Sequence, residues 1–452
     1  MDPVRPIAPP SVLATSANPT SARADELTTA PASTRVGNFR WVICALLLFG
    51  VTKNYIDRQV LGVLKSTLQH DFGWNEIQYG HLVSYFQMAY AAGMVFMGRL
   101  IDRFGTRVGY ALAMAFWSLA SMAHAAAGSF ATFAAARVAL GFGEAGVFPA
   151  SIKCVAEWFP KKERALATGI FNAGTSAGAI ITPLVVPWIA LHWGWRSAFL
   201  LTGALGFVWL IFWFLLYRKP EEHPRLSKAE LDYIRSDPSE PVGKIKWSAL
   251  LPHRQTYTFV VGKFLTDPIW WFYLFWVPDF LQRQHGLALM NIGIPIMVIY
   301  LISDVGSVAG GWLSSALINH GSTVNAARKI TMLVCALCVT PIVFAHRIQS
   351  LPGAVLLIGL AAAAHQGFSA NLYTLTSDMF PARAVGSVVG IGGMAGALGG
   401  LCIAWIVGHV LQWTGSYKVP FLIAGGAYLL ALALIHALVP RMEPAHIDGD
   451  AG

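Results

Sequence analysis

Charged side chains are scarce in this sequence. Asp, Glu, Lys and Arg make up only 12% of its 452 residues, whereas hydrophobic residues make up 55%. A soluble domain of average composition carries about 25% charged residues. Half of that share leaves too few charges to solvate a globule of this size. The composition therefore excludes a soluble protein and predicts an integral membrane protein embedded in a lipid bilayer.

Catalytic motifs are also missing. No nucleophile, metal-binding or phosphate-cradling motif occurs in a suitable context, so we predict neither an enzyme nor a bound cofactor or metal. Cysteine is rare, and Cys335 and Cys338 form a CALC pair with no second pair and no nearby His. We interpret both as packing residues. The net charge of +9 does not indicate nucleic acid, because Lys and Arg form short clusters between apolar runs, as in cytoplasmic loops.

Long apolar runs dominate the chain. A membrane-spanning helix needs about 20 residues, and twelve such segments are predicted, at 39–64, 79–101, 106–127, 130–155, 165–190, 196–217, 257–281, 291–317, 327–346, 352–376, 384–411 and 418–440. The fold class is thus an all-α membrane protein. A polar linker separates six spans from six, and we predict a short amphipathic helix in it around Ser227–Arg235, with Ser227 as its cap.

Five parts follow from these spans, in chain order: a disordered cytoplasmic tail at 1–38, a six-helix bundle at 39–217, a cytoplasmic linker at 218–256, a second bundle at 257–440, and a cytoplasmic tail at 441–452. The loops after even-numbered spans hold about 17 Lys and Arg, against about 5 after the odd ones. Because positive charge stays inside, both termini are expected to be cytoplasmic. We expect a monomer.

The two halves repeat each other. WFPKKERALATGIFNAGTSAG at 158–178 aligns with MFPARAVGSVVGIGGMAGALG at 379–399, an offset of 221 residues. GRLID at 98–102 likewise matches GWLSS at 311–315. Two parallel six-helix repeats are an architecture in which the binding site lies at the membrane midplane, between bundles that rock against each other.

Longer motifs resemble a known family. GRLIDRFGTR at 98–107 resembles the signature loop between helices 2 and 3 of the major facilitator superfamily. NYIDRQ, RVALGFGEAGVFPA and EWFPKKERALATGIFNAG are similar to its anion:cation symporter branch. KFLTDPIWWFYLFWVPDFL at 263–281 and AHQGFSANLYTLTSDMFP at 364–381 look most like bacterial hexuronate transporters. The resemblance implies twelve transmembrane helices in two six-helix bundles, and proton-coupled import of a sugar-acid anion across the bacterial inner membrane by alternating access.

The signature loop is implied to gate the transporter. Its glycines permit close packing, Asp102 caps a helix of the other half, and the arginines pin the loop while the inward side is closed. The residues concerned are Gly98, Asp102, Arg103, Gly105 and Arg107. The second-half copy departs from this pattern, because Ser315 stands where the first half has Asp102, and we transfer no gating role to it.

Several charges fall within predicted spans, where each costs about 2.5–3.5 kcal/mol unless it is paired or faces a wet cavity. Lys53 and Asp57 are i,i+4 neighbours and can pair, whereas Arg58 lies about 100° around the helix. Arg137 and Glu144 lie within about 20° of one helix face, about 10.5 Å apart along the axis. Static buried ion pairs are the alternative interpretation for all of them.

The resemblance assigns roles to these charges. Asp57 and Glu144 match proton-carrying carboxylates, Arg137 matches part of the coupling network, and Arg58 matches the residue that binds the substrate carboxylate. The chemistry agrees with this assignment, because a guanidinium holds a carboxylate in bidentate fashion and stays charged. Burial raises the pKa of a carboxyl group and a nearby Arg lowers it, so substrate movement can toggle protonation.

Further candidates complete the predicted substrate site. Tyr55, Tyr90 and, more weakly, Tyr85 and Thr175 match substrate-contacting positions of the branch. Trp270 and Trp271 form either a stacking face for a sugar ring or an interface belt. His365 is the repeat counterpart of Glu144 and, with Gln366, Ser369 and Asn371, offers hydrogen bonds to sugar hydroxyls. Lys263 and Asp267 are i,i+4 neighbours in the seventh span, and the role of Lys263 stays open. Asp267 is interpreted as a packing residue or, with Pro268, as a helix break, and Asp304 as a packing residue.

We therefore predict a proton-coupled symporter of a sugar acid, with a hexuronate such as glucuronate or galacturonate as the preferred substrate. Alternatives in the same branch are an aldonate, an aldarate, or an aromatic or other organic carboxylate. An exporter of apolar drugs is disfavoured by the fixed charge of Arg58. A membrane sensor built on a transporter scaffold is the alternative from a different class.

Overall fold

The computed structural model describes residues 37–236, 247–380, 382–445 and 447, and the regular structure of these residues is entirely helical. The predicted tail at 1–38 lies outside the described residues except for its last two. The long helices are α1 (Phe39–Val63), α3 (Glu76–Ala123), α4 (Phe130–Glu144), α5 (Val147–Trp158), α6 (Lys161–Asn172), α7 (Gly174–Trp193), α8 (Trp195–Leu216), α11 (Arg254–His285), α12 (Gly293–Asn319), α13 (Val324–Val339), α14 (Leu351–Met379), α15 (Ala382–Thr414) and α16 (Lys418–Leu438).

These helices account for the twelve predicted spans. The second and third spans both lie in α3, which kinks at Gly105, where φ of +76° requires a residue without Cβ. The fourth span is α4 with α5, and the fifth is α6 with α7. Ten segments of the described chain are apolar and long enough to cross a membrane by length and composition. The first part of α3 and α11 fall outside that set, and α11 carries two buried charges, Lys263 and Asp279.

The predicted helix break at Asp267-Pro268 is wrong. Helix α11 continues through both Pro268 and Pro278. Gly399 of α15 packs directly against this point, because a Cβ there would lie 2.7 Å from Cγ of Pro268. A proline that lacks one helical hydrogen bond is tolerated when a neighbouring helix packs this closely and holds the chain in place.

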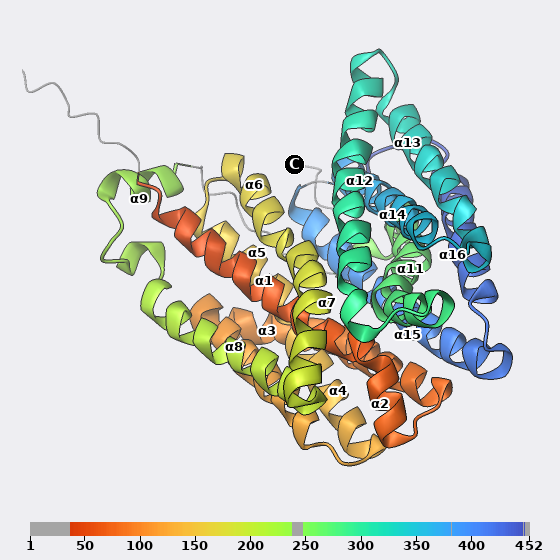
Figure 1. Ribbon diagram of the computed structural model, residues 1–452. Coiled ribbons are helices and arrows are strands. Elements are labelled where there is room, and N and C mark those ends of the chain that lie inside the picture. The colour runs from red at the N-terminus through yellow and green to blue at the C-terminus, as the bar shows by residue number, and fades with distance from the viewer. Residues whose placement is uncertain (1–36, 237–246, 381, 446, 448–452) are drawn as a thin grey trace, which may run out of the picture.

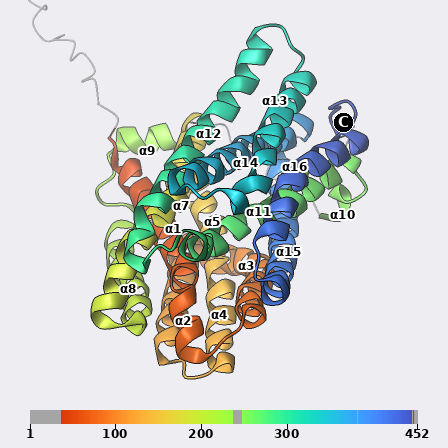
Figure 2. The ribbon, with the colours of Figure 1, turned by 45° about the vertical axis from the view of Figure 1, so that its right-hand side comes forward.

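The helices pack in two groups that follow the sequence repeat. α1 contacts α5, α6, α7 and α8, and α3 contacts α4, α5 and α8, whereas α11 contacts α14, α15 and α16, and α12 contacts α13 and α14. The chain leaves its helix at Phe159 and again at Phe380, 221 residues later, both in extended conformation. The most extensive contacts between the groups are those of α3 with α15, α7 with α12, and α1 with α11 (Figures 1 and 2).

One end of the molecule holds the two halves together. The short helix α2 (Lys65–Phe72), the start of α3, the end of α11 and the turn between α15 and α16 meet there. We call this the joined end. Figure 1 shows the ribbons of the two halves spreading apart from it, with α9 and the tips of α12 and α13 at the far end.

The linker contains η2 (Pro220–Glu222), α9 (Lys228–Ile234) and α10 (Trp247–Leu250). The predicted helix and cap are confirmed, since the side chain of Ser227 accepts a hydrogen bond from the backbone N–H of Glu230. Glu230 in turn accepts from the N–H groups of Phe39 and Arg40, at 3.2 and 3.1 Å. The linker therefore caps the first turn of α1, whose N–H groups have no partner within the helix.

Candidate functional site

Arg58 lies at the interface of the two halves, on α1. Its Nε is 3.0 Å and its Nη2 is 2.9 Å from Oε2 of Glu144, and Nη2 also donates to Oδ1 of Asn54 at 3.3 Å. Arg58 is 1% exposed and Glu144 is fully buried. The structure thus brings together the predicted substrate-binding cation and one predicted proton carrier as a buried ion pair.

Aromatic rings surround the guanidinium of Arg58. Its Cζ lies between 4.8 and 5.2 Å from the centroids of four rings, those of Tyr55, Phe86, Tyr90 and Trp271. Such cation–π contacts are strongest where water is excluded. Trp271 comes from α11, so the second half contributes one wall. We call these four residues with Arg58 the arginine cage.

Local backbone structure places Glu144 at the cage. Helix α4 ends at Glu144, and α5 begins three residues later, after Ala145 and Gly146. A Cβ at Gly143 would lie 2.9 Å from Cβ of Trp117, and one at Gly146 would lie 2.9 Å from Cβ of Ala113. Small residues therefore let α3 approach the helix break closely, and the carboxylate is held there.

Arg137 has no hydrogen-bond partner for any of its three guanidinium nitrogens among the described residues, although it is fully buried. It lies over the ring of Phe86 at 4.6 Å and within electrostatic range of Glu144. The shared helix face of Arg137 and Glu144 does not yield an ion pair, because Glu144 bonds Arg58 instead. A buried charge without a hydrogen-bond partner is costly.

Asp57 faces the interior of the first half. It pairs with Lys53 and accepts a hydrogen bond from Oγ of Ser121 at 3.1 Å. Nζ of Lys53 donates to Oγ of Ser118 at 2.8 Å and lies over the ring of Trp117. Asp57 and Arg58, adjacent in sequence, therefore belong to two separate polar clusters, and Lys53 belongs to the first.

Of the predicted tryptophan pair, Trp271 is buried and Trp270 is half-buried, and both contact other side chains of the protein. Trp270 stacks on His365 with centroids 5.1 Å apart, and Nδ1 of His365 is 2.6 Å from the hydroxyl of Tyr428. Trp270 also contacts Tyr300, whose hydroxyl accepts from Nε2 of Gln59 in the first half at 3.2 Å. His365 thus already has a partner in the second half.

The other predicted substrate contacts lie apart from the arginine cage. Nδ2 of Asn371 donates to the carbonyls of Gly310 and Gly367, at 3.1 and 2.9 Å, and so joins α12 to α14. Tyr85 stacks on His81, which contacts His409 of α15. On α14, Gln366 is half-buried and Ser369 is buried. Thr175, on α7, is half-buried.

The signature loop contacts its own half. Nη2 of Arg107 donates to the carbonyl of Phe214 at 3.1 Å, and Nε1 of Trp213 donates to the carbonyl of Arg107 at 2.9 Å. Arg103 is exposed. The side chain of Asp102 and the surroundings of Gly98 are not described, so the gating role stays a prediction. In the second-half copy, Ser315 donates to the carbonyl of Gly311 on its own helix.

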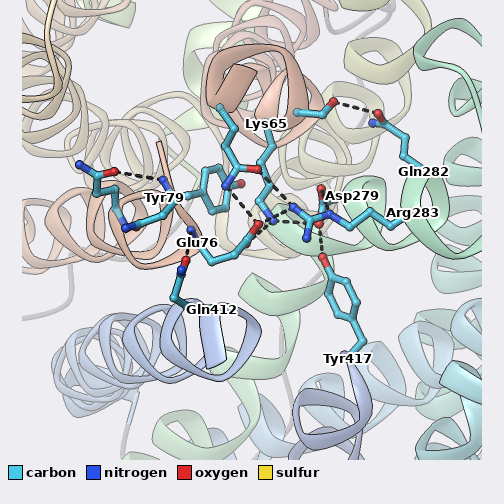
Figure 3. A network of polar contacts seen from close by, with 12 residues as sticks. Lys65, Glu76, Tyr79, Asp279, Gln282, Arg283, Gln412 and Tyr417 are labelled. Carbon is cyan, nitrogen blue, oxygen red and sulfur yellow. Dashed lines mark hydrogen bonds and ion pairs between the residues drawn. The ribbon is translucent and has the colours of Figure 1, made fainter. Parts of the chain in front are cut away.

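A charged network at the joined end was missed by the sequence interpretation. Lys65 pairs with Glu76 at 2.7 Å and with Asp279 at 2.8 Å, and Arg283 pairs with the same two acids (Figure 3). Tyr417 donates to Asp279, as Figure 3 also shows. We call these five residues the joined-end network. These residues lie at the ends of spans, where charges look like those of ordinary loops. The one clue in the sequence is that both halves carry charged residues at this end.

Comparisons with known proteins place the chain in a family. The model of the Major Facilitator Superfamily matches residues 47–346. A D-galactonate transporter of Escherichia coli O6:H1 is 31% identical over 89% of this chain and 95% of its own length. A hexuronate transporter of Escherichia coli K12 is 30% identical over 84% and 90%. A probable galactarate/D-glucarate transporter of Bacillus subtilis is 27% identical over 90% and 95%.

Solved structures agree on the fold. A bacterial homolog of the human lysosomal transporter Spinster, in an inward-facing and unoccupied conformation, matches with a TM-score of 0.71 at 20% identity, over 90% of this chain and all of that one. A D-xylose-proton symporter matches with a TM-score of 0.68 at 16% identity, over 90% and 99%. The chain belongs to the Major Facilitator Superfamily, a family of membrane transporters and not of enzymes.

Proposed function

We propose that this protein imports a sugar-acid anion together with protons across a bacterial inner membrane, by alternating access. A hexuronate such as glucuronate or galacturonate is the first substrate to test, and an aldonate, an aldarate or another organic carboxylate is the alternative. Relatives named for hexuronates, galactonate and galactarate support this substrate class. We further propose a monomer with both termini in the cytoplasm and the five-part division of the chain given above.

One observation carries the proposal: the arginine cage holds Glu144 where a substrate carboxylate would bind. The guanidinium of Arg58, which here contacts only Oε2 of Glu144, can hold either this side chain or the carboxylate of the substrate, but both anions together would repel each other. Protonation of Glu144 releases Arg58 for the substrate. Proton binding and substrate binding thus favour each other, and this coupling is what symport requires.

Arg137 and Asp57 extend the mechanism. Arg137, whose guanidinium nitrogens have no hydrogen-bond partner among the described residues, lies near Glu144. We assign it to the return step, in which Glu144 loses its proton once the substrate has gone and returns to Arg58. Asp57 with Lys53 is a separate site for a second proton. Importing one anion against a negative-inside potential costs about 2.3 kcal/mol per 100 mV. One proton cancels this cost, and a second would let the potential drive uptake.

The orientation follows from the distribution of basic residues, which assigns the joined end to the periplasm. In this arrangement the periplasmic side is closed and the halves diverge toward the cytoplasm. The joined-end network must then open, and the loop at 98–107 must close, for the outward-facing state. Bundles rocking about a fixed midplane site would accomplish both changes.

The function is tested with purified protein in liposomes. With an acidic outside, labelled galacturonate, galactonate and galactarate are offered separately. We expect uptake of at least one sugar acid above its equilibrium level, abolished when a protonophore collapses the gradient. Uptake indifferent to pH, or no uptake of any carboxylate, would refute the proposal. Tight binding without any uptake would instead indicate the sensor alternative.

A further inference from the structure

A second charged pair lies on the face of α11 that carries a wall of the arginine cage. Lys263, Asp267 and Trp271 are spaced four residues apart, so they lie along one side of the helix. Trp271 contacts Arg58 at 4.9 Å. With a rise of 1.5 Å per residue, Asp267 lies about 6 Å and Lys263 about 12 Å further along α11, away from the joined end.

The pair is ordered by its neighbours. Nζ of Lys263 is 2.7 Å from Oδ2 of Asp267 and 3.0 Å from the hydroxyl of Tyr373 on α14. Gly396 of α15 makes room for the carboxylate, because a Cβ there would lie 3.0 Å from Cγ of Asp267 and closer still to Oδ2. Asp267 keeps 18% of its side chain exposed and Tyr373 is 42% exposed, so both remain within reach of a ligand.

The same pair is close to the arginine cage across the interface. Tyr55 of the cage lies within electrostatic range of Asp267 and Tyr373, and Tyr90 lies within range of Tyr373. Arg58 therefore marks one end of a set of polar side chains along this interface, and Asp267 with Lys263 marks the other. The proposed function uses the first end and leaves the second without a role.

The pair has the same sequence pattern as Lys53 and Asp57. Both pairs are Lys-x-x-x-Asp on the first helix of a half, 210 residues apart. The first-half pair is enclosed in its own bundle, where Asp57 is fully buried. The second-half pair differs because it faces the interface and the hydroxyl of Tyr373. The same pair of charges is thus placed where it can meet a substrate.

We propose that Asp267 and Lys263 form the distal end of the substrate site and select sugar acids with one carboxylate over those with two. The inference rests on the proposed function, in which Arg58 takes the first carboxylate. At the distal end, a carboxylate acceptor and a phenol donor suit the hydroxyl groups of a uronate or an aldonate. A second carboxylate would face Asp267 at close range, and Lys263 is already neutralised by that residue.

The test is competition in proteoliposomes that hold the full chain. Unlabelled galactonate and galactarate compete against uptake of labelled galacturonate, and the ratio of their inhibition constants is measured. In the wild type, galactarate should compete at least tenfold more weakly than galactonate. Asp267→Asn keeps the shape but removes the repulsion and frees the charge of Lys263, so this ratio should move toward galactarate by about tenfold, or about 1.4 kcal/mol.

Two further variants keep the result interpretable. Asp304→Asn neutralises another half-buried acid of the second half, which bonds Ser176 at 2.5 Å, and should leave the ratio unchanged. Lys263→Gln combined with Asp267→Asn removes both charges and should give a smaller gain for galactarate than Asp267→Asn alone. If Asp267→Asn does not fold, the selectivity is tested by the wild-type ratio of inhibition constants and by the change of that ratio in the double variant.

The outcomes separate this inference from the proposed function. A wild type that takes up galactarate as well as galactonate, in a proton-dependent way, overturns the selectivity and leaves symport intact. An unchanged ratio in a folded, active Asp267→Asn variant does the same. Absence of uptake for every sugar acid overturns both.

Discussion

Lys65 and Asp279 join the two halves of the protein through a buried ion pair, with Nζ of Lys65 lying 2.8 Å from Oδ2 of Asp279. Both side chains are 1% exposed. Each half contributes one acid and one base to the network, because Glu76 pairs with Lys65 and Arg283 pairs with Asp279. Two more pairs, Lys65 with Asp279 and Arg283 with Glu76, cross from one half to the other. Opening this end must therefore separate opposite charges, which a transporter can accept only if another contact replaces them.

Loss of the acid from the second half should loosen the joined end. Asp279→Asn leaves Lys65 and Arg283 sharing one acid, Glu76, and shifts the population toward a state open at this end. Removing one partner of a buried pair typically costs about 3–5 kcal/mol. We expect a cysteine placed at Ser66 to react several-fold faster with a membrane-impermeant maleimide.

Asp71 provides the matched control for this experiment. It lies near the same end but accepts from Nε1 of Trp195 at 2.8 Å, within the first half. Asp71→Asn should leave the labelling rate unchanged. Equal labelling in wild type and Asp279→Asn would show that the network does not hold the end closed.

The arginine cage makes substrate binding depend on pH in one direction. At acidic pH Glu144 is protonated and Arg58 is free, so binding should be tight. At alkaline pH Glu144 is ionised and competes for Arg58, so binding should weaken. Titration calorimetry with galacturonate from acidic to alkaline pH should show an affinity that falls as the pH rises in the wild type, and an affinity independent of pH in Glu144→Gln. A pH-dependent Glu144→Gln variant would assign the titration to another group.

Glu144→Gln should also separate exchange from accumulation. The amide can neither carry a proton nor compete as an anion, so galacturonate on both sides should still exchange through the protein. Accumulation driven by a pH gradient should be lost. The measurement compares counterflow with gradient-driven uptake in the same liposomes. Loss of both activities in a folded variant would make Glu144 structural.

Arg58→Lys tests the geometry of the cage rather than its charge. Lys keeps the positive charge but presents no planar fork to a carboxylate and stacks less well on aromatic rings. We expect affinity for galacturonate to fall by tenfold or more, although the variant should remain folded. Retained affinity would remove the guanidinium from the substrate site. Arg40→Lys is a control of the same chemistry outside the site, because Arg40 pairs with Glu163 and Glu230.

Much of this structure follows from the sequence because membrane helices obey simple rules. Apolar length placed the helices, and the two aligned repeat segments each contain a helix end, at Phe159 and at Phe380. Helix periodicity also separated Asp57 from Arg58 correctly. It could not give the partner of Glu144, since periodicity relates residues of one helix only, and Arg58 lies on another.

The joined-end network was not predicted from the sequence for a related reason. Lys65 and Asp279 are 214 residues apart in the chain, and each looks like an ordinary charge at the end of a span. Only the packing of α2 against α11 brings them together. The distal pair was visible as two i,i+4 neighbours, but its position depends on Gly396, whose lack of a side chain matters only once α15 is placed against α11.

Gly396→Ala tests that placement. In a helix, replacing Gly by Ala usually gains about 1 kcal/mol. At position 396, however, the new methyl group would meet the carboxylate of Asp267 and force either that side chain or α15 to move. We expect a lower thermal unfolding temperature, together with a changed ratio of galactarate to galactonate competition. Gly426 of α16 is the matched control, because a Cβ there meets nothing within 4 Å. Gly426→Ala should leave stability equal or higher and the ratio unchanged, and equal behaviour of the two variants would show that Gly396 does not position the distal pair.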